Sequence, residues 1–125
     1  MNRKGFTMVE MMVVVGIIAL LAAIAIPNLL RSKVSANDAA AQGTLKTIAV
    51  ALENYAAING GYPIDPNDLL GVNPPYLNQN FFVGQYSGFT YTYSFAQFAY
   101  SVVANPINSN SGTRSFTIST GAVLQ

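Results

Sequence analysis

The sequence predicts an α+β fold in which one long N-terminal helix packs on a small antiparallel sheet of about three strands. Apolar residues recur at helical spacing as far as Asn59, and aromatic and polar residues then alternate from Phe89 to Phe95. Loops rich in Asn, Ser, Gly and Pro separate the later segments. With 125 residues, the chain has room for one domain of this kind.

Composition argues against an enzyme. Half of the residues are hydrophobic (51%) and only 9% are charged, which is too apolar for a disordered chain. The net charge of +1 gives no reason to expect a nucleic-acid partner. Cysteine and histidine are absent, and we find no nucleophile–base pair, phosphate-binding glycine loop or zinc-ligand spacing. We therefore predict no catalytic residue, no metal and no cofactor.

The first thirty residues carry a membrane signal. No charged residue occurs from Met11 to Leu30, and these twenty residues would span about 30 Å as a helix, the thickness of a bilayer's hydrocarbon core. Arg3 and Lys4 precede this stretch. The positive-inside rule therefore predicts a single pass with a cytoplasmic N-terminus and an exported C-terminal domain.

Three interpretations of this stretch compete: a signal peptide cut after Ala25, a plain anchor, and a short leader that leaves the apolar helix in the mature protein. Glu10 favours the third. A carboxylate in a membrane segment costs up to a few kcal/mol. The nine large aliphatic residues beyond it return about 3–5 kcal/mol in total, so insertion survives with little margin. A residue kept at this cost needs a function and a partner.

The sequence from Gly5 to Glu10, Gly-Phe-Thr-Met-Val-Glu, followed by the apolar run and Ile26-Pro27-Asn28, closely resembles the signature of type IV pilins and type II secretion pseudopilins. The resemblance implies cleavage after Gly5 by a prepilin peptidase and N-methylation of Phe6. It also implies that Glu10 pairs with the terminal amine of a neighbouring subunit. The expected segments are a leader (1–5), a transmembrane and filament-core helix (6–30), and an amphipathic helix with a globular head (31–125).

The resemblance implies a filament subunit that polymerises with itself. It waits in the inner membrane, in contact with lipid, and is then assembled by a membrane platform and its ATPase together with minor pilins. The product is an extracellular pilus or, in the alternative, the periplasmic pseudopilus of type II secretion. A secreted binding module freed after Ala25 is a third alternative. Gly16 and Pro27 are expected to let the stalk helix kink or melt during packing.

Beyond Pro27 the helical pattern continues to Asn59-Gly60-Gly61, where glycine favours a helix end. We expect its apolar stripe to pack on the domain's own sheet. The stripe consists of Leu30, Val34, Ala41, Leu45, Ile48, Leu52 and Tyr55.

Asp65 is expected to cap a short helical turn with Pro66 as its first residue. A cation site at Asp65 and Asp68 is less favoured, because no acidic residue follows Asp68. Major pseudopilins characteristically bind calcium in the C-terminal domain, so this shortage weakens the secretion alternative. Strands are expected at 89–95, 98–103 and 115–119, with alternate aromatic residues filling the buried face of the sheet or meeting neighbouring heads in a filament.

Overall fold

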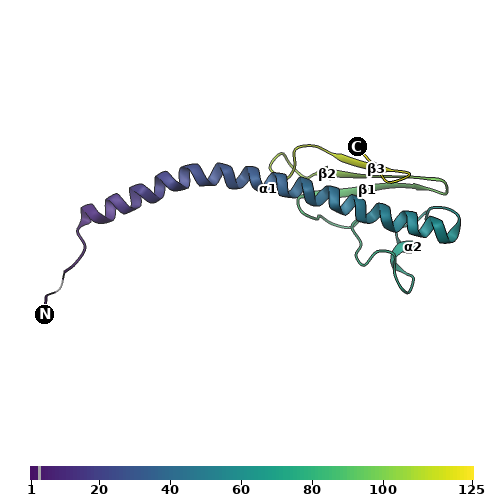
Figure 1. The fold of residues 1–125 in the computed structure, drawn as a ribbon, viewed down its shortest axis with the longest axis horizontal. Coiled ribbons are helices and arrows are strands. Elements are labelled where there is room, and N and C mark those ends of the chain that lie inside the picture. The colour runs from purple at the N-terminus through teal and green to yellow at the C-terminus, as the bar shows by residue number, and fades with distance from the viewer. Residues whose placement is uncertain (3) are drawn as a thin grey trace. The chain divides into compact units, whose positions relative to one another are not determined.

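The computed structural model describes residues 1–2 and 4–125 (Figure 1). Arg3, on which part of the predicted membrane orientation rests, lies outside the described residues. The chain divides into two compact units, Met1–Ser32 and Lys33–Gln125. Helix α1 (Met8–Asn59, 52 residues) supplies most of the first unit and the helical layer of the second.

The second unit is the α+β head that the sequence predicts. Its antiparallel sheet has the order β1-β2-β3-β4, and each strand pairs with its neighbour in the sequence. The strands are β1 (Phe89–Ala96), β2 (Ala99–Pro106), β3 (Phe116–Ser119) and β4 (Val123–Leu124). The short fourth strand was not predicted, because two residues carry no readable alternation.

The core of the head lies between α1 and one face of the sheet. Four members of the predicted stripe are fully buried: Ala41, Leu45, Ile48 and Leu52. The sheet contributes Phe89, Tyr91, Tyr100, Val102, Ala104, Phe116 and Ile118. The prediction was wrong for Leu30, which belongs to the first unit and is 57% exposed. Its helical spacing continues the stripe, but the strands all belong to the second unit.

Helix α2 (Asn67–Leu70) follows α1 through a turn. It begins one residue later than expected, so Pro66 precedes the helix instead of opening it. Asp65 still caps the turn, because its Oδ1 accepts a hydrogen bond from the Asn67 amide at 2.8 Å.

The loop between β2 and β3 is fixed to α1. Asn37 Nδ2 donates to the Ser111 carbonyl at 2.9 Å, and the Asp38 carboxylate accepts bonds from the amide and the hydroxyl of Thr113 at 3.0 and 2.6 Å. Gly112 lies between these contacts, and a Cβ there would collide with the Phe89 ring. The loop therefore needs glycine for close approach.

A second set of contacts holds the C-terminal turn. The half-buried Glu53 carboxylate accepts hydrogen bonds from the hydroxyls of Tyr62 and Tyr100, at 3.2 and 3.1 Å, and from the Gly121 amide at 3.0 Å. The Tyr100 hydroxyl in turn accepts from the Ala122 amide at 3.1 Å. Burial raises the pKa of Tyr100 well above its ordinary value, and the Glu53 carboxylate adds to this shift. One helical carboxylate thus ties together three segments that are distant in sequence.

Two glycine substitutions test the close packing of the loop between β2 and β3. Gly112→Ala is expected to lower the free energy of unfolding by about 1–3 kcal/mol, because the new methyl group displaces Phe89 from the core. Gly43→Ala meets no atom within 4 Å on the exposed side of α1 and is expected to raise it by about 1 kcal/mol. Thermal unfolding of the detergent-solubilised protein, followed by circular dichroism, compares the two. Equal effects would contradict the close approach at Gly112.

Two tyrosine substitutions test the Glu53 contacts. Tyr100→Phe removes a hydroxyl with a charged acceptor and an amide donor, and is expected to cost about 2 kcal/mol of stability. Tyr91→Phe is the control, because the buried Tyr91 hydroxyl makes no hydrogen bond of good geometry among the described residues and has only a weak interaction with the Thr44 side chain. Its removal is expected to be neutral or stabilising by about 1 kcal/mol. Denaturant unfolding measures both, and a larger loss for Tyr91→Phe would refute this account.

Candidate functional site

The expected cleavage site lies in an accessible, irregular segment. The described residues before Met8 form no regular structure, and α1 begins directly after them (Figure 1). Gly5 and Phe6 are both exposed, Phe6 by 82%, and nothing lies within 4 Å of the position a Cβ would take on Gly5. A peptidase needs an exposed, unpaired backbone, and this segment offers one.

Glu10 closes the first turn of α1 against Thr7. Its Oε2 accepts hydrogen bonds from the amide and the hydroxyl of Thr7 at 2.7 and 3.0 Å, and the Glu10 amide donates to Thr7 Oγ1 at 3.2 Å. This reciprocal arrangement is a capping box, which satisfies amides that a helix start leaves unpaired. Sequence reasoning gave Glu10 only an intermolecular partner, although the spacing Thr7-Met8-Val9-Glu10 is the signal for this cap.

The apolar part of α1 is exposed along its length. No residue of its most apolar 18-residue window is buried within the chain, and by length and composition this helix could cross a membrane. Side chains such as Leu20 and Ile24 are exposed by 70% and 67%. A shallow hollow of about 380 Å³ at its start is lined by Phe6, Val9, Glu10, Met11, Val13 and Val14. The surface can bind only apolar partners, except at Glu10.

The helix continues through Gly16 and Pro27 without a break. The kinking or melting expected there during packing therefore stays a prediction about the assembled state. Pro27 lacks the amide that would bond back along the helix, so this turn is the weakest of the segment.

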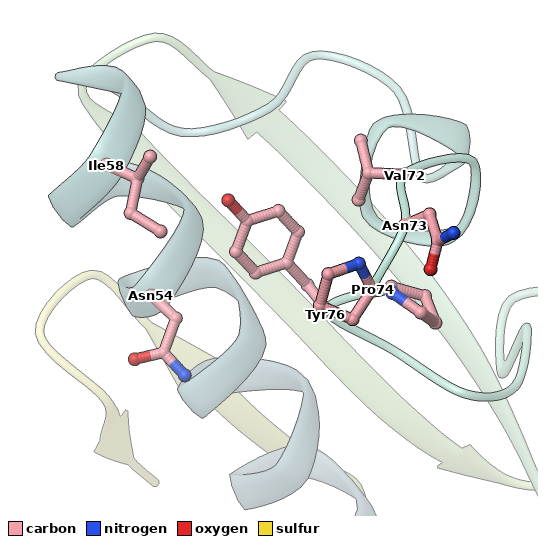
Figure 2. A pocket seen from close by; sticks show the side chains of 7 residues that line it. Asn54, Ile58, Val72, Asn73, Pro74 and Tyr76 are labelled. Atoms are coloured by element: carbon pink, nitrogen blue, oxygen red, sulfur yellow. The ribbon is translucent and has the colours of Figure 1, made fainter.

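The head has a separate hollow between the end of α1 and the loop after α2. It has a volume of about 370 Å³, and Figure 2 shows Tyr76 pointing into the space between Ile58 and Val72. Its lining comprises Asn54, Ile58, Val72, Asn73, Pro74, Pro75 and Tyr76. Apart from the Tyr76 hydroxyl, its side chains are amides and apolar groups.

The described residues contain no group of three or more acidic side chains that could hold a metal ion. Asp65 and Asp68 lie on or beside α2, and Asp65 is engaged as a cap. The expectation of a head without a bound metal stays a prediction.

Comparisons with known proteins agree with the N-terminal signature. Residues 1–26 match the family model of the prokaryotic N-terminal methylation motif. The chain is 43% identical over 61 residues to the major component of the type IV wide pilus of Thermus thermophilus, which is 49% of this chain and 47% of that protein. It is 41% identical over 62 residues to the type II secretion system core protein G of Pseudomonas aeruginosa, 50% of this chain and 44% of that one.

The fold is similar to that of a solved structure. A type IV pilin from Shewanella oneidensis aligns with a TM-score of 0.52 over 74% of this chain and 89% of that chain, at 23% identity. The resemblance to type IV pilins and pseudopilins is confirmed. The matched segment spans less than half the length of the two curated relatives.

The structure also shows which residues of this pilin-like chain sequence reasoning missed. Asp38 and Glu53 lie outside the apolar stripe of α1, and the sequence predicted no role for them. In the structure each fixes a loop of the head to α1. Thr113 lies 75 residues beyond Asp38 and Gly121 lies 68 residues beyond Glu53, so no local pattern reveals these contacts.

Proposed function

We propose that this chain is the structural subunit of a type IV pilus-like filament, made with a five-residue leader and polymerised through the apolar half of α1. The observation that carries the proposal is the exposed apolar surface from Met11 to Leu30, preceded by an exposed cleavage site and a single carboxylate. In water such a surface would aggregate. A bilayer and a bundle of like helices are the two environments that cover it.

The leader ends at Gly5, and its removal by a prepilin peptidase leaves Phe6 as the new, N-methylated terminus. The family model for the methylation motif and the exposure of both residues support this step. Before assembly the helix spans the inner membrane with its N-terminus in the cytoplasm, as Lys4 and the apolar run favour. An assembly platform, its ATPase and minor pilins are partners by likeness to the pilin family.

Glu10 gives the packing its register. Inside a bundle of apolar helices its carboxylate is stable only beside a cation, and cleavage creates one cation per subunit at Phe6. Removal of one partner from a buried ion pair costs about 3–5 kcal/mol. Pairing of Glu10 with the amine of a neighbouring Phe6 therefore admits one axial position of neighbouring helices and rejects others.

The second candidate is the major pseudopilin of type II secretion, favoured by the 41% identity to core protein G. The shortage of acidic side chains for a calcium site in the head weighs against it. The third alternative, release after Ala25, is the weakest, because Ala25 lies in the interior of a continuous helix.

Intact-mass and N-terminal analysis of protein sheared from cells tests the processing. We expect a chain that begins at methylated Phe6. A chain that begins at Met1 or near Ile26 would refute the filament proposal and return the protein to plain anchors or secreted domains.

Substitution of Glu10 tests assembly separately from processing. Glu10→Ala is expected to leave membrane insertion and cleavage intact and to lower the yield of sheared filaments by at least about tenfold, because the neighbour's amine loses its partner. Thr7→Ala, which removes the cap hydroxyl but keeps the charge, is the matched control and should lose less. Normal filaments from Glu10→Ala would exclude the registry role.

A further inference from the structure

A hollow beside the edge strand β1 combines a carboxylate with amide groups and aromatic rings. It has a volume of about 290 Å³ and is lined by Asp65, Pro66, Asn67, Asn80, Phe82, Val83 and Tyr93. Asp65 is exposed, and only its Oδ1 is used by the cap of α2 among the described residues. The rings of Phe82 and Tyr93 lie with their centroids 4.9 Å apart. A free carboxylate oxygen beside ring faces is suited to a basic side chain.

An exposed basic side chain stands on the opposite flank of the sheet. Arg114 lies just before β3, and its guanidinium sits 5.2 Å from the centroid of the Phe116 ring. No hydrogen bond or ion pair of Arg114 occurs among the described residues, so its N–H groups face solvent. Its loop is held to α1 through Thr113 and Asp38. The donor is therefore presented from a fixed position.

The two groups are too far apart to meet within one head. Two strand spacings separate β1 from β3 in the sheet order, about 10 Å. Phe116 lies level with Tyr91 through Ala104, so Arg114 is displaced from Tyr93 by four residues along the strands, about 13 Å. An arginine side chain does not span that distance. The two groups can meet only between copies.

The remaining charges of the head leave few other candidates. Of its four acidic side chains, Asp38 and Glu53 are occupied by internal hydrogen bonds, and of the other two only Asp65 lines the hollow. Its three basic side chains are Lys33, Lys46 and Arg114, and only Arg114 lies on a sheet flank. Complementary groups on two different flanks form a head-to-tail contact, which can repeat from copy to copy along a helical filament.

We propose that Arg114 of one subunit docks in the Asp65 hollow of a second copy of this chain, so that the heads as well as the stalks hold the filament together. The inference rests on the proposed filament function and adds the surface by which neighbouring heads recognise each other. The guanidinium would contact the free Asp65 oxygen and the ring faces.

Charge removal tests the pair in the full-length chain. Asp65→Asn keeps an oxygen for the cap of α2, and Arg114→Gln keeps the length of the side chain. Each is expected to lower the yield of sheared filaments about threefold or more, and the double variant should fall no further than the worse single variant. Asp68→Asn and Lys46→Gln remove the same charges outside the contact and should stay near wild type. Losses that multiply in the double variant would overturn the pairing.

Thiol crosslinking tests the geometry, and the absence of native cysteine removes any background. In a chain carrying both Asn67→Cys and Ser115→Cys, treatment of filaments with a bifunctional maleimide is expected to give a ladder of covalent multimers. The control pair Thr47→Cys and Ser115→Cys should stay monomeric. A crosslinker is used because an arginine that reaches an aspartate holds the neighbouring Cα atoms too far apart for a direct disulfide.

Filaments whose Asn67→Cys/Ser115→Cys subunits stay monomeric would overturn the docking and leave the filament function intact. A single crosslinked band that contains this chain and a different protein would assign the hollow to that protein and would also overturn the docking between copies. Wild-type cells that make no filament would overturn both proposals.

Discussion

The constraint on which the rest depends is an apolar helical surface that the chain has no means of burying. From Met11 to Leu30 the side chains have no sheet or second helix of their own unit against them. Burial of apolar surface returns about 25 cal/mol per Å², so every subunit carries a large free energy that only lipid or other subunits release. Transfer from lipid to a helix bundle changes that energy little, because both environments are apolar. In the proposed filament, apolar burial alone therefore gives little preference for the bundle, and polar contacts can supply that preference.

Under the proposed function, Glu10 is the polar group that makes this selection, and the capping box shows how its carboxylate is satisfied within one chain. In the precursor, its carboxylate is satisfied by Thr7 and by the partial positive charge of the helix start. The proposed cleavage before Phe6 would add a full positive charge at the same end of α1. A cation at a helix N-terminus is unfavourable, which gives the new amine a reason to seek a carboxylate. A single cut would thus make both members of the proposed intermolecular pair available.

The parts of the structure that sequence reasoning reached are those set by local pattern. The helix from the apolar run to Asn59, the three longer strands and the cap at Asp65 all follow from spacing, alternation and turn residues within a few positions. The short β4 did not follow, because two residues carry no readable alternation. The roles of Asp38 and Glu53 did not follow, because Thr113 and Gly121 are remote from them in sequence. Leu30 was misplaced for a related reason. Periodicity identifies an apolar face but says nothing about where the covering sheet ends.

The internal roles of Asp38 and Glu53 also explain how a head with so little charge stays ordered. The chain has no cysteine, and no acid follows Asp68, so neither a disulfide nor an acid-rich metal loop is available to fix the C-terminal turn. Glu53 performs this task by accepting hydrogen bonds from two tyrosine hydroxyls and a backbone amide. Burial raises the pKa of Tyr100, so its hydroxyl keeps the proton that it donates. A carboxylate that is engaged in hydrogen bonds inside the head is no longer available for contacts at the surface. The few charges that stay free, Asp65 and Arg114 among them, then have few competing partners, and this scarcity makes a contact between heads specific.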